Sequence, residues 1–258
     1  MRYIKVKNRE RRFIDPRRLS LDLNGLGIKK ISEIIGLKEF RDLKCLELQG
    51  NKLETVEWTV ELPNLEHLFL GANSISKIQG LELLPNLRRL VLDSNKFSHI
   101  HGLEVLPNLI FLYLSLNNIR EIQGLDSLIN LKELSLSINN INLIKGFDNL
   151  DNLTYLSLMS NQITRLQDLE HLKKLEVLDL TRNPLRSIEG IEGLISLREL
   201  NLCDTKVTSI MNELDALPHL ESVDISGRLG HIPFEELRYL IEEKGISIIP
   251  YGRPPLEP

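Results

Sequence analysis

The sequence predicts an α/β fold: a right-handed solenoid with a curved parallel β-sheet on its concave face and 3₁₀ or extended segments on its convex face. Three observations predict it. Leucines recur with a 22-residue period, each period holds a leucine–x–leucine alternation, and an asparagine follows each alternation. A single coil of this length cannot bury its own apolar edge, so the coils must stack.

The clearest repeat runs from Leu87 to Asn108, and the next begins directly after it, at Leu109. The unit reads L-x-x-L-x-L-x-x-N-x-I-x-x-I-x-G-L-x-x-L-x-N. The same register holds through eight copies, which leaves little room for chance. These copies begin at Leu43, Leu65, Leu87, Leu109, Leu131, Leu153, Leu175 and Leu197.

Each part of the unit predicts a local structure. The leucine–x–leucine alternation has the period of a strand whose leucines face inward. The asparagine follows where the chain must turn off the sheet, and its amide can both accept from and donate to backbone groups. The remainder is too short for a long helix, so we expect 3₁₀ turns and extended segments there. The asparagines expected to form a buried ladder are Asn51, Asn73, Asn95, Asn117, Asn139, Asn161 and Asn183.

The repeat decays at both ends of the array, as capping coils require. Residues 21–31 read as an imperfect first coil. Near the other end, Thr205 and Arg228 stand where a ladder asparagine is expected, and the step from Leu197 to Leu220 is one residue longer than the others. We therefore assign residues 19–230 to a solenoid of about ten coils.

Residues 231–258 predict a cap of a different kind. A helix is expected with Pro233 at its first position and Gly245 as its stop, followed by a short strand over residues 246–249. The tail from Tyr251 continues neither element and is expected to be loose. The apolar face of the helix is expected to be Phe234, Leu237, Leu240 and Ile241.

Residues 1–18 form a basic segment with eight Lys or Arg against two Asp or Glu, a net charge of +6. Because the whole chain carries −4, the remainder carries −10. Residues 3–7 and 11–14 are compatible with a β-hairpin that caps the first coil. The alternative is a basic arm for anionic partners.

Composition narrows the class of protein. Hydrophobic residues make up 42% and charged residues 26%, as in soluble folded proteins, and no apolar run approaches the roughly 18 residues of a membrane span. Met1 to Lys7 lacks the apolar core of a secretory signal. The two cysteines, Cys45 and Cys203, fall seven coils apart, roughly 34 Å, which is too far for a disulfide. We therefore expect a cytoplasmic protein.

This repeat resembles the 22-residue class of leucine-rich repeats, over residues of about 20 to 230. The class is typified by the leucine-rich-repeat regulatory subunit of protein phosphatase 1, and bacterial internalins use a similar length. The resemblance implies a non-enzymatic scaffold that binds a protein on its concave face. It leaves two alternatives: a regulator of an enzyme such as a protein phosphatase or small GTPase, and an extracellular adhesion protein whose signal peptide is missing from this sequence.

Outward-facing strand residues alternate with the inward leucines, so the concave face can be assigned. An apolar, aromatic group falls on neighbouring repeats of this face. Aromatic side chains offer a large contact area at low entropic cost, so the group predicts a binding surface. The alternative is that neighbouring side chains only shield one another. The group consists of Phe69, Val91, Phe111, Tyr113 and Tyr155.

Further along, the same face becomes acidic, with Glu133, Asp179, Glu199 and Asp224. These carboxylates predict a surface that receives a basic partner, or else an ordinary solvated surface. An acidic face argues against nucleic acid, whose binding needs a basic stripe.

No catalytic constellation is present in the sequence. The histidines are scattered, and none forms a metal-ligand spacing with cysteine; His99 and His101 give only a weak hint of metal binding. No phosphate-binding loop or nucleophile motif occurs, and glycines spaced by one repeat, such as Gly80 and Gly102, belong to the repeat turn. We therefore expect a monomeric protein that is not an enzyme and holds no metal or cofactor.

Overall fold

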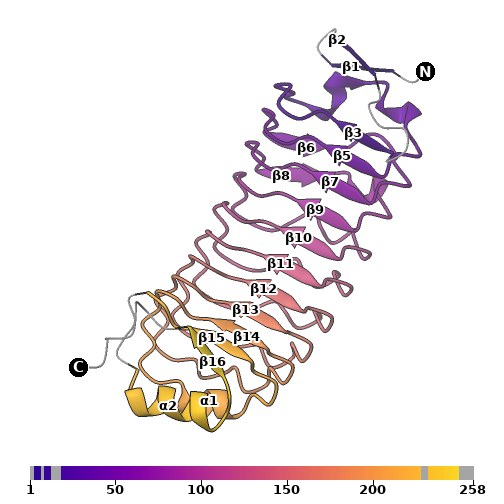
Figure 1. The fold of residues 1–258 in the computed structure, drawn as a ribbon. Coiled ribbons are helices and arrows are strands. Elements are labelled where there is room, and N and C mark those ends of the chain that lie inside the picture. Colours follow the sequence, from indigo (N-terminus) through magenta and orange to yellow (C-terminus); the bar gives the residue numbers. More distant parts are fainter. Residues whose placement is uncertain (1–2, 7–8, 13–18, 228–231, 250–258) are drawn as a thin grey trace. The chain divides into compact units, whose positions relative to one another are not determined.

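The computed structural model describes residues 3–6, 9–12, 19–227 and 232–249. The chain divides into two compact units, and within each the short strands lie side by side (Figure 1). The N-terminal unit consists of Met1–Ile119 and Gln123–Leu131, and the C-terminal unit consists of Arg120–Ile122 and Lys132–Pro258. Each unit is a solenoid of short parallel strands with few helices, which confirms the predicted fold class.

Five three-residue strands form the main sheet of the N-terminal unit. Equivalent repeat positions lie side by side: Leu46 is opposite Leu68, which is opposite Leu90. These leucines are completely buried, because the middle residue of each strand faces the core. In chain order the strands are β3 (Ser20–Asp22), β5 (Cys45–Glu47), β7 (His67–Phe69), β9 (Arg89–Val91) and β10 (Phe111–Tyr113).

The chain between these strands is extended or 3₁₀, as the short repeat predicts. A glycine is needed there because the backbones of successive coils come close. Gly102 has a φ of 76°, and a Cβ atom at this position would lie 2.6 Å from the carbonyl oxygen of Ile78. The elements are the paired strands β6 (Thr55–Glu57) and β8 (Lys77–Gln79) and the 3₁₀ helices η1 (Ile31–Glu33), η2 (Leu37–Glu39) and η3 (Leu81–Leu83).

A β-hairpin lies at the start of the chain, as one of the two interpretations of the basic segment predicts, but its second strand begins at Arg9 rather than at Arg11. β1 (Tyr3–Val6) pairs antiparallel with β2 (Arg9–Arg12) and, on its other edge, with β4 (Ile34–Ile35). Ile4 and Val6 are buried, so β1 covers apolar surface of the first coil. Residues 13–18 of the basic segment lie outside the described residues.

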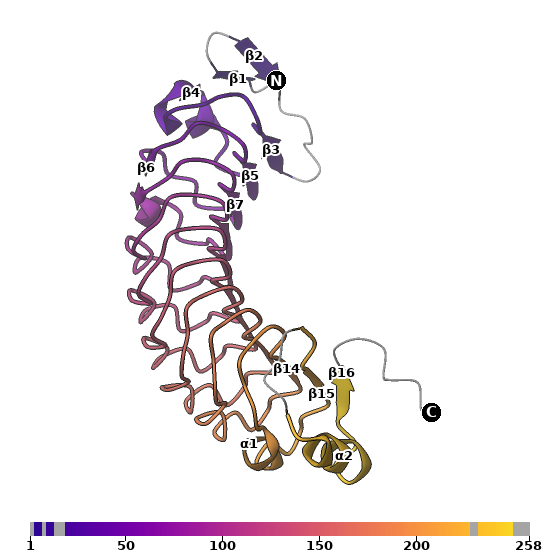
Figure 2. The same cartoon turned by 90° about the vertical axis from the view of Figure 1, so that its left-hand side faces the viewer.

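Six parallel strands form the sheet of the C-terminal unit. A five-residue helix, α1 (Met211–Asp215), lies in the coil that is one residue longer than the others. A second helix, α2 (Phe234–Glu242), contacts it (Figure 2). The strands are β11 (Glu133–Ser135), β12 (Tyr155–Ser157), β13 (Val177–Asp179), β14 (Glu199–Asn201), β15 (Ser222–Asp224) and β16 (Ser247–Ile249).

The predicted helix and strand at the C-terminal end are present, and β16 extends the sheet by pairing with β15. Two details of the prediction are wrong. Pro233 is the N-cap residue rather than the first helical residue, because its ψ of 135° is extended. The four apolar residues do not share a buried face: Leu240 is buried, whereas Phe234 is 74% and Ile241 51% exposed.

Helical geometry explains this difference. Residues of a helix are spaced by about 100°, so Phe234 and Ile241 lie roughly 100° or more around the helix from Leu240. Packing Leu240 into the core therefore turns the other two side chains toward solvent. The predicted tail, from Tyr251 onward, and Arg228 lie outside the described residues.

The asparagine ladder is confirmed. Asn95 accepts a hydrogen bond from the backbone N–H of Ile75 (2.8 Å) and donates to the carbonyl oxygens of Leu70 and Leu92 (both 3.0 Å). Each ladder asparagine is buried except Asn73, which is half-buried. At the end of the series the buried Thr205 donates to the carbonyl oxygen of Leu202 (2.8 Å).

A second asparagine series binds successive coils of the N-terminal unit on the exposed side of the turn. Asn86 donates to the carbonyl oxygen of Pro63 (2.7 Å), and Asn108 donates to that of Pro85 (3.0 Å). This asparagine is the last position of the repeat, whose role as a coil-to-coil donor the sequence alone did not reveal. Both series hold the coils together without using the outward-facing strand side chains.

Candidate functional site

The outer face of each sheet is defined here by three positions per strand: its first and third residues and the residue two places further. Burial confirms the alternation behind this definition, because the strands have a buried middle residue between two partly exposed ones. Side chains at equal positions of neighbouring strands lie next to one another. The outer face therefore carries three parallel columns of side chains in each unit.

In the N-terminal unit, four of the five predicted aromatic-group residues come together, on β7, β9 and β10. Register places Tyr113 beside Val91, and Val91 beside Phe69, in one column; Phe111 lies in the neighbouring column. All four side chains are half-buried. We call Phe69, Val91, Phe111 and Tyr113 the aromatic zone. The fifth predicted member, Tyr155, belongs to the C-terminal unit.

Arg89 is a member of this surface that sequence reasoning did not select. Its guanidinium carbon lies 4.1 Å from the ring centre of Phe111 and 5.7 Å from that of Tyr113. Both distances are in the range of cation–π contacts, which contribute about 0.5–1 kcal/mol at exposed sites. The sequence could have indicated this contact, because the repeat register places Arg89 between His67 and Phe111 in one column.

His67 and Cys45 continue this column away from the aromatic zone. Burial lowers the pKa of His67, and the positive charge of Arg89 lowers it further. Its Nδ1 atom is buried and has no hydrogen-bond partner among the described residues. Burial also raises the pKa of the Cys45 thiol to about 11, helped by the nearby Glu47 carboxylate. At neutral pH the thiol is protonated, which does not suit a nucleophile.

Asp93 borders the aromatic zone, two residues beyond the end of β9. Burial raises the pKa of its carboxyl group, although one of its oxygens accepts a hydrogen bond from the backbone N–H of Ser115 (2.6 Å). Its carboxylate is thus engaged within its own sheet.

The predicted acidic residues all lie on the outer face of the C-terminal unit. Glu133, Tyr155 and Glu199 share one column with Val177 between the last two. Asp179 and Asp224 lie in the neighbouring column, two strands apart. Glu199 is exposed, and the other three carboxylates are half-buried. The structure therefore brings the acidic residues and Tyr155 together on one unit, whereas the aromatic zone belongs to the other.

Hydroxyl groups connect part of this acidic surface. The hydroxyl oxygens of Ser137 and Ser157 are 2.7 Å apart, and Ser157 donates to Asp179 (3.1 Å). Burial raises the pKa of Tyr155, and the carboxylates of Asp179 and Glu133 act in the same direction.

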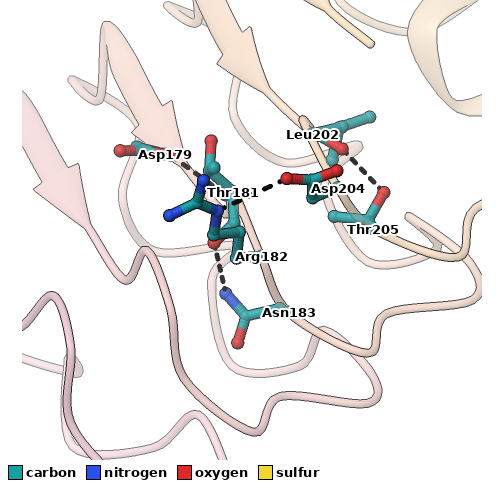
Figure 3. A network of polar contacts seen from close by, with 7 residues as sticks. All are labelled: Asp179, Thr181, Arg182, Asn183, Leu202, Asp204 and Thr205. Atoms are coloured by element: carbon teal, nitrogen blue, oxygen red, sulfur yellow. Dashed lines mark hydrogen bonds and ion pairs between the residues drawn. The ribbon is translucent and has the colours of Figure 1, made fainter. Parts of the chain in front are cut away.

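The edge of this surface also carries an ion pair. Arg182 and Asp204 lie at equivalent positions of successive coils, and the guanidinium Nε is 3.3 Å from the carboxylate (Figure 3). The same view shows Asp179 accepting from the backbone N–H of Thr181 (3.0 Å). Because Arg182 offsets the charge of Asp204, the negative character of this surface comes from the strand positions.

Within the part of the chain that the structure describes, no three histidine, cysteine or acidic side chains gather in a way that would hold a metal ion. None of the described helices combines the length and apolar character needed to cross a bilayer.

Two stretches match known repeat families. Residues 41–97 match the family described as "Leucine rich repeat", and residues 151–193 match the one described as "Leucine Rich repeats (2 copies)". No curated protein matches the sequence of this chain.

Solved structures of repeat proteins share the fold. Internalin C2 of Listeria monocytogenes is 25% identical with a TM-score of 0.61, over 82% of this chain and 80% of that one. A leucine-rich-repeat protein of Leptospira interrogans is 26% identical with a TM-score of 0.72, over 83% of this chain and 62% of its own. The Listeria internalin InlF, 20% identical with a TM-score of 0.58 over 89% and 79%, shares the fold alone.

Proposed function

We propose that this leucine-rich-repeat protein is a non-enzymatic scaffold that binds a protein partner on the outer face of its sheet, with the aromatic zone of the N-terminal unit as the anchor. Leucine-rich repeats commonly mediate protein–protein interaction, which supports the class of function. The observation that carries the site is the grouping of Phe69, Val91, Phe111 and Tyr113 on three adjacent strands.

The composition of this zone supports binding over mutual shielding. Surfaces that bind proteins are enriched in tyrosine, phenylalanine and arginine at their centres, and Phe111, Tyr113 and Arg89 are in contact here. All of these side chains remain partly exposed, so apolar area is still available to a partner. Mutual shielding would leave the same side chains half-buried. Substitution of these residues is therefore needed to distinguish partner binding from mutual shielding.

The test compares the double variant Phe111→Ala and Tyr113→Ala with a matched pair on the same unit. Val105→Ala and Ile129→Ala also remove exposed apolar side chains, but these are 37% and 52% exposed and lie off the outer face. A partner is captured from native cell extract, identified by mass spectrometry, purified, and its affinity measured for each variant. We expect at least a tenfold loss for the outer-face pair and no loss for the control pair, with similar thermal unfolding.

Two results would count against the proposal. If the Phe111 and Tyr113 double variant unfolds at a much lower temperature, the side chains serve to shield one another. If it is stable and binds the partner as tightly as the unmodified chain, the binding surface lies elsewhere.

The acidic surface of the C-terminal unit is proposed as an auxiliary contact for a basic region of the partner. Glu199 is exposed, and the half-buried Glu133 lies in the same column of the outer face. Surface charges of this kind act mainly on the association rate. The double variant Glu133→Gln and Glu199→Gln should therefore slow association at low salt and leave the dissociation rate nearly unchanged.

The cytoplasm is the proposed place of action, because both cysteines are free thiols. Regulation of an enzyme, such as a phosphatase or small GTPase, and extracellular adhesion stay hypotheses that rest on resemblance.

A further inference from the structure

Among the outer-face positions that the structure describes on β3, β5, β7 and β9–β16, Arg89 is the single Lys or Arg. Apart from the histidine at position 67, every other ionisable side chain of the Asp, Glu, Lys, Arg or His type at these positions is an acid. The seven acids are Asp22, Glu47, Asp93, Glu133, Asp179, Glu199 and Asp224. The presence of one arginine among these acids therefore needs an explanation.

Within the described residues, no carboxylate pairs with Arg89, in contrast to Arg182, Arg198 and Arg238, each of which has an acidic partner. The nearest outer-face acid along its own strand is Asp93, four residues on and so roughly 13 Å away. The Asp93 carboxylate is in any case engaged with the Ser115 N–H. Glu47 is two strands away and in the neighbouring column, roughly 12 Å.

The aromatic rings next to Arg89 contact the face of its guanidinium but do not accept hydrogen bonds from its N–H groups. One side rests on the Phe111 ring, and the Tyr113 ring is close by. Its neighbour on the other side is His67, where burial and the positive charge of Arg89 lower the pKa of the imidazole. Stacking on an aromatic ring leaves the N–H groups at the edge of the guanidinium free to donate, and these match a carboxylate in geometry.

We propose that Arg89 selects the partner: the aromatic zone binds a protein segment that presents one Asp or Glu side chain flanked by aromatic or aliphatic residues. This inference rests on the proposed function and adds the chemistry of the ligand. The apolar flanks of the segment would contact Phe69, Val91 and Tyr113, and its carboxylate would accept hydrogen bonds from Arg89. Binding of apolar residues would exclude water around the ion pair and so strengthen it.

The experiment uses the full chain, immobilised, and a random 12-residue peptide library displayed on phage as the probe. Selections are run in parallel on the unmodified chain, on Arg89→Gln, and on Arg88→Gln. Arg88 is the matched control, because it is the adjacent residue and is exposed, but lies outside the outer-face positions. Thermal unfolding of each variant checks that it is folded.

We expect peptides selected by the unmodified chain and by Arg88→Gln to be enriched in an acid between apolar residues, and those selected by Arg89→Gln to lack that acid. In a selected peptide, exchange of the acid for its amide should weaken binding about 10- to 100-fold on the unmodified chain and have little effect on Arg89→Gln. Arg89→Lys should restore part of the preference.

Selection of no peptide by the unmodified chain, or of peptides without an acid preference, would overturn the inference. So would an acid preference that persists in Arg89→Gln. A different result would contradict the proposed function. In that case, the selected peptides would bind equally well after Phe111 and Tyr113 are both replaced by alanine. Peptides that need these two rings but no acid would leave the function standing and remove the role of Arg89.

Discussion

The residue before each ladder asparagine, and before Thr205 at the equivalent position, adopts a left-handed backbone conformation. Its φ lies between 53° and 63° from Gly50 to Asp204, although the side chains there have nothing in common. Left-handed φ is unfavourable for residues with a Cβ, and most of all for β-branched ones such as Ile138. The sequence did not indicate this conformation, because only one of these positions carries the expected glycine. They are Gly50, Ala72, Ser94, Leu116, Ile138, Ser160, Arg182 and Asp204.

Gly50 allows the cost of this conformation to be measured. A Cβ at this position would meet nothing nearer than 4.0 Å, so Gly50→Ala adds backbone strain without a steric clash. We expect a loss of about 1 kcal/mol in the free energy of unfolding, measured with urea. Gly71→Ala is the control, because Gly71 has no positive φ and a Cβ there would be 3.4 Å from the nearest atom. Equal losses in the two variants would contradict the strain argument.

The Cys45 thiol gives a prediction on pH. Its pKa is raised from 9.0 to about 11, so at pH 8 the folded protein holds about 100-fold less thiolate than the unfolded chain. In a Cys203→Ser variant, alkylation of Cys45 by iodoacetamide should therefore be at least that much slower when the chain is folded. The rate should keep rising about tenfold per pH unit until roughly pH 11. A plateau near pH 9 in the folded protein would show that the thiol is not shifted.

At the scale of the element, the turn after each strand is held by one side chain. Asn117 accepts from the Phe97 N–H (3.0 Å) and donates to the carbonyl oxygens of Leu92 (3.1 Å) and Leu114 (3.0 Å). It is 7% exposed, so water cannot replace these bonds. The ladder was predictable from the sequence because the asparagine recurs at one repeat position. The helix face was not, because packing of α2 against the last coil decides which apolar residues are buried.

Asn117→Ala leaves the buried N–H of Phe97 without its partner. It also removes one of the two amide donors to the Leu92 carbonyl oxygen, which still accepts from Asn95. We expect a loss of about 1–3 kcal/mol in the free energy of unfolding, which is the cost of one unsatisfied buried group. The control is Asn118→Ala, because Asn118 is the next residue and its side chain is exposed. Urea unfolding of both variants gives the comparison, and a loss below about 1 kcal/mol for Asn117→Ala would mean that the bonds are dispensable.

At the scale of the whole molecule, the 22-residue period determined the prediction. It fixed the parallel strands, the inward leucines and the outward columns, because each of these depends only on position within the repeat. The stacking of Arg89 on Phe111 depends on a contact between two coils, which periodicity does not encode. The grouping of Tyr155 with the aromatic zone stays a prediction, because these residues belong to different units.

The same period makes a prediction about length. Deletion of residues 65–86 removes one full repeat and joins Asn64 to Leu87, so the pattern continues in register. We expect cooperative unfolding with a lower midpoint, because one coil and one interface between coils are lost. Deletion of residues 65–84, two residues shorter, shifts every following leucine against the preceding coils. Circular dichroism during heating should then show no cooperative transition for the N-terminal unit; equal behaviour of both deletions would contradict the stacking argument.

The asparagine ladder has a consequence for how such a surface can change over generations. Because buried amides and leucines hold the coils, we expect substitutions at the outer positions to leave the fold intact. Different residue types already occupy equivalent outer positions of successive strands, such as Ser20, His67 and Arg89. A new binding specificity would therefore need only a few substitutions at these partly exposed positions. With the buried residues unchanged, we expect single substitutions on the outer face to change which partner the protein binds while the coils keep their structure.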